Sequence, residues 1–238
     1  MRQATGKLGA NFARGKARHT KSRATQFVKT LMCFAFLFFV SSAIAEPMHF
    51  EVNGSGGNCC SWIQATGGIS PDTPAVFEAF LRSSEFVPKV VRLNSGGGSV
   101  GAGVALGEIF RARGFATEVG STKLNPESVP IPGSQIGYAK APGRCASACA
   151  FAFLGGIERT LDPDSKLAFH RSHFGGIEPT GNDAQMLIAA LLLYIVNMGV
   201  DARLIKLATE AGPSEARWIR PDEAHDLRVT TGGRSSPH

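Results

Sequence analysis

Charged side chains are scarce in this chain, and internal repeats and long apolar runs are missing. Only 18% of the 238 residues are charged, whereas 43% are hydrophobic. This balance excludes a disordered protein, because enough apolar surface is present to build a core. No block of sequence recurs, which excludes a solenoid or a propeller, and the 28 glycines follow no fixed period, which excludes collagen. The length therefore predicts one ordinary domain or two small ones.

Acidic side chains are absent from residues 1–45, which hold eight of the 25 basic ones. The remaining 17 basic groups are accompanied by all 19 acidic groups, so residues 46–238 carry a net charge of −2 although the whole chain carries +6. The positive charge belongs to the N-terminal segment alone. A surface for nucleic acid is therefore excluded from the expected functions.

The first 45 residues have the order of a secretory signal: a basic region, a short apolar region (Leu31–Val40) and small residues ending in A-x-A at Ala45. We predict cleavage after Ala45, which makes residues 46–238 an exported domain, periplasmic or secreted. The apolar region is shorter than the ~20 residues that a membrane span needs. The alternative is an uncleaved N-terminal anchor, which would be the chain's contact with a membrane.

Four cysteines remain after this cleavage, Cys59, Cys60, Cys145 and Cys149. An oxidising compartment favours disulfides, and four cysteines allow three full pairings. A bond between the neighbours Cys59 and Cys60 would be strained, so we expect a bridge from this pair to Cys145 or Cys149. A zinc site is disfavoured, because the pairs lack C-x₂-C spacing.

Strands alternate with helices along the exported domain, and this order predicts a single α/β domain. Residues 122–143, with four prolines, are expected to form an irregular loop. The helix over 182–198 is apolar nearly all round, so we expect it to be covered in the core or in a subunit interface. The predicted strands are 48–52, 89–93, 115–119 and 166–170, and the predicted helices are 73–82, 99–113, 146–154, 182–198 and 201–211.

A glycine loop, Asn94–Gly98, joins a predicted strand to a predicted helix. Backbone N–H groups in such a loop can bind negative charge. Gly96, Gly98 and Gly101 satisfy G-x-G-x-x-G, with Glu118 further on, which is compatible with dinucleotide binding. The same loop is also compatible with an oxyanion hole or with a simple tight turn.

Ser147 stands among small residues at the start of a predicted helix, and His170 ends a predicted strand. Cys145 and Cys149 are four positions apart, so in that helix they would share one face and Ser147 would point away from them. A serine needs a base to act as a nucleophile at neutral pH. G-x-S-x-G is missing, so an α/β-hydrolase is not supported, and His170 with His173 lacks a third metal ligand.

These motifs together resemble the Clp protease proteolytic subunit and its relatives in the Clp/crotonase superfamily, in particular the exported Clp-like bacterial proteins. The matching blocks occur in the family's order. They are LNSGGGSVGAG at 93–103, GRCASACAFAFLGG at 143–156, LAFHRSHFGG at 167–176 and ARWIRPDEAHDL at 216–227.

The resemblance implies a spiral of β-strands flanked by helices, and hydrolysis of peptide bonds by a serine. It assigns Ser147 as nucleophile, His170 as general base, and the backbone N–H groups of Gly97 and Ala148 as the oxyanion hole. It also favours an oxyanion hole over a dinucleotide site. Neither a metal nor another cofactor is needed, and an exported enzyme would act without ATP on short peptides or unfolded protein. By analogy with the family's rings, the chain is expected to be a homo-oligomer.

One departure from the family concerns the third catalytic residue. The family's Asp precedes an Arg-aromatic pair, but here Ala216 precedes Arg217-Trp218. We expect the adjacent Glu215 to orient His170, or a Ser–His pair to suffice. The alternatives are a catalytically inactive Clp-like binding or assembly protein, and a crotonase-like activity on thioesters that would not need Ser147.

Overall fold

The computed structural model describes residues 46–54, 61–124, 137–170, 181–212 and 215–232. Residues 45–238 form one compact unit, and its described part is α/β, as predicted. The predicted signal, and with it the cleavage after Ala45, lies outside the described residues.

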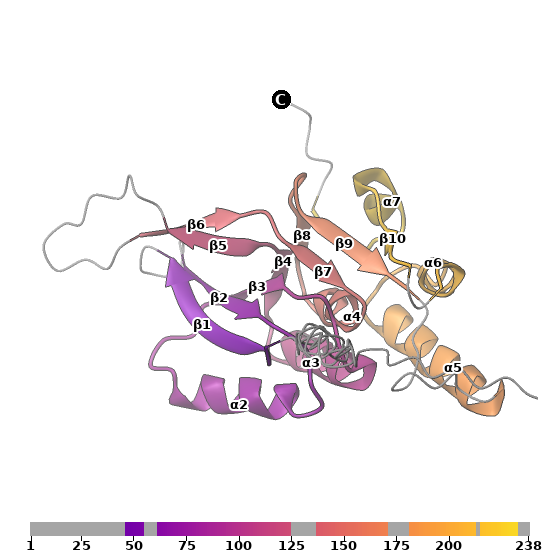
Figure 1. Ribbon diagram of the computed structural model, residues 1–238, viewed down its shortest axis with the longest axis horizontal. Helices are drawn as coiled ribbons and strands as arrows, with labels where there is room; N and C mark the ends of the chain where they lie inside the picture. The colour runs from indigo at the N-terminus through magenta and orange to yellow at the C-terminus, as the bar shows by residue number, and fades with distance from the viewer. Residues whose placement is uncertain (1–45, 55–60, 125–136, 171–180, 213–214, 233–238) are drawn as a thin grey trace, which may run out of the picture. The chain divides into compact units, whose positions relative to one another are not determined.

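The largest sheet has the strand order β1-β2-β3-β4-β8 (Figure 1). β1 runs antiparallel to β2, whereas the other neighbours are parallel. The strands are β1 (His49–Gly54), β2 (Ser61–Thr66), β3 (Val90–Asn94), β4 (Ala116–Val119) and β8 (Arg159–Leu161). Parallel neighbours place the carboxyl ends of β2, β3 and β4 at one edge, and the glycine loop follows β3 at that edge.

A second sheet has the order β10-β9-β7, with β9 (Lys166–Phe169) parallel to β7 (Arg144–Ala146) and antiparallel to β10 (Arg217–Trp218). A bridge between Ser95 and Cys145 joins this sheet to the end of β3. β5 (Ser121–Leu124) and β6 (Tyr138–Ala141) form a separate antiparallel pair.

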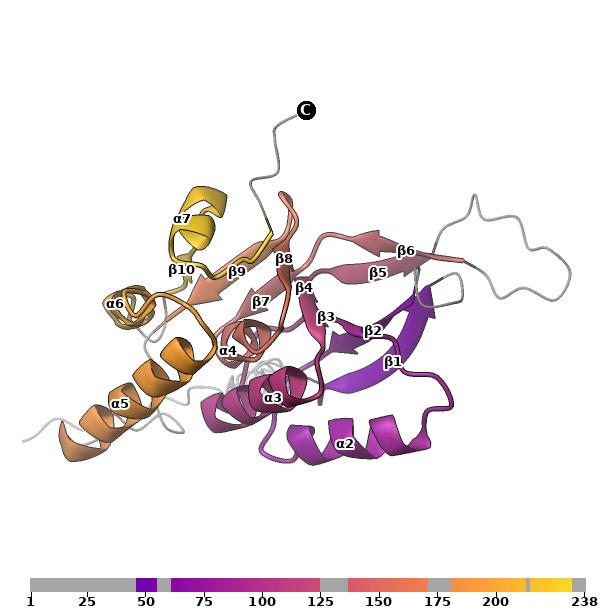
Figure 2. The same cartoon turned by 180° about the vertical axis from the view of Figure 1, so that it is seen from behind.

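The helices α2 and α3 lie next to each other (Figures 1 and 2). The helices α5, α6 and α7 lie on the side of the sheets that is away from β5 and β6. Within the described ranges, no helix combines the length and the apolar character that crossing a bilayer requires. The helices are α2 (Thr73–Ser83), α3 (Val100–Ala112), α4 (Ala148–Leu154), α5 (Gly181–Asn197), α6 (Leu204–Glu210) and α7 (Pro221–Asp226).

Phenylalanine rings fill the space between β1, α2 and α3. Phe77 of α2 is fully buried, and its ring centroid lies 4.8 Å from that of Phe50, 5.2 Å from that of Phe110 and 5.7 Å from that of Phe115. Tilted and edge-to-face arrangements at these separations are favourable beyond the burial of apolar area. The apolar spacing that predicted the α2 helix therefore serves this cluster.

The helices and strands expected from the sequence are present, with ends shifted by a few residues. Residues 122–143, however, were wrongly expected to be an irregular loop. Their two ends form β5 and β6, which pair from Ser121–Ala141 to Leu124–Tyr138. Prolines cluster between these strands, in 125–136, outside the described residues. β2 was also missed, because its neighbourhood is rich in glycine and serine.

The α5 helix is less buried than its composition predicts. The buried residues of this helix are Leu191, Tyr194 and Ile195, and they belong to the hydrophobic core, so the expected covering by the core holds for one face of the helix only. Met186, Ile188, Leu193 and Val196 are exposed by 65%, 41%, 66% and 53%. The alternative, a subunit interface, stays a prediction.

Arg159 is a buried cation that binds only carbonyl oxygens among the described side-chain contacts. It is 3% exposed, and burial lowers its pKa to about 10, so it remains charged at neutral pH. These carbonyl oxygens lie at the C-terminal ends of three helices or just after them, where carbonyl groups have no hydrogen-bond donor within the helix. They are Leu154 and Gly156 at the end of α4, Met198 after α5, and Arg228 and Val229 after α7, at 2.8–3.3 Å.

We expect Arg159→Met to destabilise the fold by about 3–5 kcal/mol, because the change leaves buried carbonyls unpaired. Chemical denaturation measures the change. The matched control is Arg113→Met, which removes an exposed ion pair with Glu78 and should change the free energy of unfolding by about 0.5 kcal/mol or less. Equal stabilities of the two variants would contradict this role for Arg159.

Candidate active site

Ser147 occupies a sharp turn between β7 and α4. Its backbone has φ 58° and ψ −124°, a conformation that is rare for a residue other than glycine. The Ser147 N–H donates to the carbonyl of Ala168 at 3.1 Å, and the Ser147 carbonyl accepts from Ala150 N–H at 2.9 Å. The residue thus stays attached to β9 on one side and begins α4 on the other. Ser147 is buried, with 7% of its surface exposed.

The pairing of β7 with β9 places His170 next to this turn. Cys145 lies opposite Leu167 and Ala146 opposite Ala168. Extending the register by one step places Ser147 beside Phe169, and His170 follows directly. Neighbouring strands are about 4.8 Å apart, so the structure brings Ser147 and His170 to the same end of the same strand pair. His170 is half-buried.

The glycine loop packs against the backbone of the Ser147 turn. Gly97 has φ +105°, and a Cβ placed on it would lie 2.6 Å from the Ala146 carbonyl oxygen and 2.7 Å from Ser147 Cβ. No side chain fits there. The loop is held by Ile69, whose N–H donates to the Gly97 carbonyl at 2.9 Å and whose carbonyl accepts from Ser99 N–H at 2.7 Å.

The two expected oxyanion amides, those of Gly97 and Ala148, therefore come from segments that touch beside Ser147. The same hypothetical Cβ of Gly97 would be 3.2 Å from the Ala148 nitrogen. Ala148 is the first residue of α4, so its N–H has no acceptor within that helix. The Gly97 N–H donates to Ser95 Oγ at 3.1 Å, a contact that the sequence did not predict. An oxyanion would share or replace this bond.

Glu215 lies two residues before β10, which pairs with β9 so that Arg217 is opposite Phe169. If that antiparallel register is continued by one residue, Ala216 lies opposite His170. Glu215 is the residue before Ala216 in the chain. Both Glu215 and Ala216 are exposed. Asp222, further along, is bound by the Arg220 side chain at 3.3 Å, and this hydrogen bond lowers the pKa of its carboxyl below the usual value. His173 lies outside the described residues.

The expected bridge from Cys59 or Cys60 to Cys145 or Cys149 is wrong, because Cys145 and Cys149 form a disulfide with each other. The spacing of Cys145 and Cys149 suggested that both lie in one helix, but Cys145 lies in strand β7. The turn at Ser147 reverses the direction of the backbone and brings the two Cα atoms to 5.2 Å, within the normal range for a disulfide. Cys59 and Cys60 lie outside the described residues.

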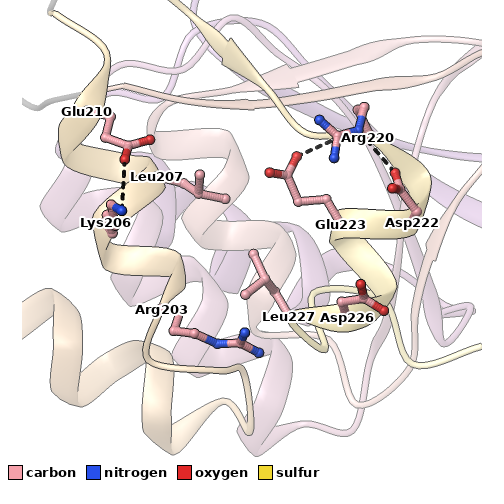
Figure 3. Close-up of a pocket in the computed structure, with 9 residues that line it drawn as sticks. All are labelled: Arg203, Lys206, Leu207, Glu210, Arg220, Asp222, Glu223, Asp226 and Leu227. Carbon is pink, nitrogen blue, oxygen red and sulfur yellow. Dashed lines mark hydrogen bonds and ion pairs between the residues drawn. The ribbon is translucent and has the colours of Figure 1, made fainter.

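A cavity of about 290 Å³ lies between α6 and α7 (Figure 3), and neither Ser147 nor His170 lines it. Its charges pair locally, as in Lys206 with Glu210 and Arg220 with Asp222. Opposite charges that compensate each other give it no strong preference for an anion or a cation. Over the described ranges, no group of three His, Cys, Asp or Glu side chains is arranged to hold a metal.

No family model matches the chain, and no curated protein matches it. Among solved structures it is similar to a serine-to-alanine mutant of the membrane-bound stomatin-specific protease 1510-N, with a TM-score of 0.45 and 17% identity over 71% of this chain and 75% of that one. ClpP1 from Listeria monocytogenes gives 0.45 and 17%, over 68% and 84%. The ClpP catalytic domain from Plasmodium falciparum gives 0.46 and 15%, over 72% and 84%. Catalytic roles for Ser147 and His170 therefore depend on where this chain places its own residues.

Replacing Gly97 by alanine should disturb the Ser147 turn, because the new Cβ would meet the Ala146 carbonyl and φ is positive. We expect a loss of about 1–3 kcal/mol in the free energy of unfolding, measured by chemical denaturation. Gly96→Ala is the matched control, since a Cβ there meets nothing within 4 Å. The packing argument fails if both variants are as stable as the wild type.

Proposed function

We propose that this protein is an exported, ATP-independent serine peptidase. The observation that carries the proposal is the meeting of three segments: the Ser147 turn, the end of β9 at His170 and the Gly97 loop. A nucleophile, a base and two backbone donors are the groups that acyl transfer requires. The motifs that resemble the Clp proteolytic subunit support the same assignment.

In the proposed mechanism, Ser147 Oγ attacks the carbonyl carbon of the scissile peptide bond while a His170 ring nitrogen accepts the hydroxyl proton. The tetrahedral oxyanion receives hydrogen bonds from the N–H groups of Gly97 and Ala148. His170 then gives the proton to the leaving amine, the C–N bond breaks and an acyl-Ser147 remains. Water, deprotonated by His170, hydrolyses this ester.

The proposed role of Glu215 is to orient His170, because Glu215 is next to Ala216, and the β9–β10 register, continued by one residue, would place Ala216 opposite His170. Because Glu215 is exposed, water screens its interaction with the imidazole. We therefore expect a modest contribution from Glu215, with the Ser–His pair and the oxyanion hole supplying most of the rate enhancement.

Export is supported by the basic-apolar-small order of residues 1–45 and by the Cys145–Cys149 disulfide, since such bonds persist in oxidising compartments. Compartments outside the cytoplasm generally lack ATP, so the substrates would be short peptides or segments that are already unfolded. A folded substrate would need an energy source to open it.

Fluorophosphonate labelling tests the serine assignment. We expect the wild type to be labelled at Ser147, Ser147→Ala to be unlabelled, and His170→Ala to react at least about 1,000-fold more slowly, because the hydroxyl loses its base. Mass spectrometry of the labelled peptide locates the adduct. Glu215→Gln should slow labelling by less than His170→Ala does.

The alternatives give different results in the same assay. A folded wild type that is not labelled would favour the catalytically inactive binding or assembly protein. Thioester turnover that survives Ser147→Ala would favour the crotonase-like activity. His173→Ala is the control for His170, and its labelling rate should equal that of the wild type.

We also propose that copies of the chain associate through the exposed apolar side chains of α5, namely Met186, Ile188, Leu193 and Val196. Covering such side chains removes apolar area from water at about 25 cal/mol per Å². This arrangement would satisfy the expectation that the apolar helix is covered in an interface.

Leu193→Glu should shift the protein toward monomers in sedimentation velocity, because a charge cannot enter an apolar interface without a large desolvation cost. Val76→Glu is the matched control, since Val76 is an exposed apolar residue on α2, 42% accessible. Identical sedimentation of wild type and Leu193→Glu would rule out α5 as the interface.

A further inference from the structure

The Cys145–Cys149 disulfide closes a five-residue segment around the proposed nucleophile. The two cysteines are four positions apart, and Ser147 lies midway between them. Cys145 belongs to β7, and Cys149 is the second residue of α4. The bond therefore ties the strand that enters the turn to the helix that leaves it, across the segment that directs Ser147 Oγ and the Ala148 N–H.

The backbone at Ser147 needs support from its surroundings. Ser147 and Arg228 have positive φ among the described residues other than glycine. Such conformations cost about 1–3 kcal/mol and persist where neighbouring structure holds them. Here the hydrogen bond to Ala168 and the packed Gly97 loop hold the turn noncovalently, and the disulfide holds it covalently. The covalent support is the one that a change in redox conditions alters.

Both ends of the crosslink are fixed in the core. Cys145 and Cys149 are 0% exposed, and Cys145 pairs with Leu167 on one side and with Ser95 on the other. Two thiols need more room than one disulfide, because unbonded sulfur atoms separate to van der Waals distance. Since β7 and α4 are held by their packing, the adjustment falls on the turn between them, which contains Ser147.

We propose that the Cys145–Cys149 disulfide is a positioning element for Ser147, so that the chain reacts at its full rate only in the oxidised form. This inference rests on the proposed peptidase function. Because both cysteines are 0% exposed, a dithiol reaches the disulfide only when the turn opens locally. The thiolate of the dithiol then attacks one cysteine sulfur and displaces the other, and the second thiol of the dithiol displaces the first cysteine sulfur. Two electrons and two protons pass to the protein, leaving two cysteine thiols and a cyclic disulfide of the reductant.

The test uses the full chain carrying Cys33→Ser, Cys59→Ser and Cys60→Ser, so that Cys145 and Cys149 are its only cysteines. Fluorophosphonate labelling is measured at several probe concentrations before reduction with dithiothreitol, after it, and after reoxidation. We expect reduction to lower the limiting labelling rate by about 10–100-fold, because small displacements of a reacting group have effects of this size. The half-saturating probe concentration should change little, and reoxidation should restore the rate.

Cys145→Ala/Cys149→Ala in the same background is the matched control. Its labelling should be slow and insensitive to dithiothreitol, while circular dichroism shows a folded protein. A reduced chain with two alkylatable thiols that labels as fast as the oxidised chain would overturn the positioning role, whether or not the double variant folds.

Hydrogen exchange separates a failure of this inference from a failure of the peptidase proposal, because it needs no activity. Reduction should speed amide exchange in residues 144–150 and leave residues 106–112 of α3 unchanged. Unchanged exchange in 144–150 would overturn the positioning role even in a chain that no probe labels. An oxidised chain that is not labelled but shows this exchange pattern would refute the peptidase and leave the disulfide as the support of the turn.

Discussion

The contact between the glycine loop and the Ser147 turn is the constraint on which the candidate site depends. The loop follows β3 and the turn follows β7, and the Ser95–Cys145 bridge aligns these two strand ends. Because Gly97 lacks a side chain, the backbones of two segments about fifty residues apart lie in close contact beside Ser147. β9 then adds His170 from a third segment. The chemistry proposed for the chain thus follows from strand register rather than from any local motif.

Two buried guanidinium groups hold the elements around this site. Arg92, 1% exposed, reaches the carboxylate of Glu118 at 2.8 Å and the Ala141 carbonyl at 2.7 Å, so it fastens the β5–β6 pair to the main sheet. The Arg159 guanidinium instead donates hydrogen bonds to backbone carbonyls at the ends of three helices. In both cases a charge inside the protein is tolerated because its hydrogen-bond donors are satisfied. The sheet edge and the helical layer are therefore fixed by polar contacts as well as by apolar packing.

The sequence was sufficient for the elements whose own residues determine them. Apolar spacing predicted α2, the glycine loop and Gly114 marked the two ends of α3, and the run KVVRL predicted β3 to within one residue. The sequence was insufficient where the local conformation depends on contacts with backbone that is distant in the chain. Cys145 and Cys149 have helical spacing, but the pairing of β7 with β9 keeps Cys145 in a strand and forces the turn at Ser147. The hydrogen bond from Gly97 to Ser95 likewise depends on a loop conformation that Ile69 holds. No periodic pattern reports such contacts.

Arg159 also bears on the order in which this chain can fold. Its partners include carbonyls of Arg228 and Val229, about seventy residues further along. Until residues 228 and 229 reach Arg159, the guanidinium lacks two of its hydrogen-bond acceptors, and enclosing it in apolar surroundings has a high free-energy cost. Contacts of such long range slow folding. The α4–α5 interior therefore completes late in folding, once the segment through residue 229 is in place.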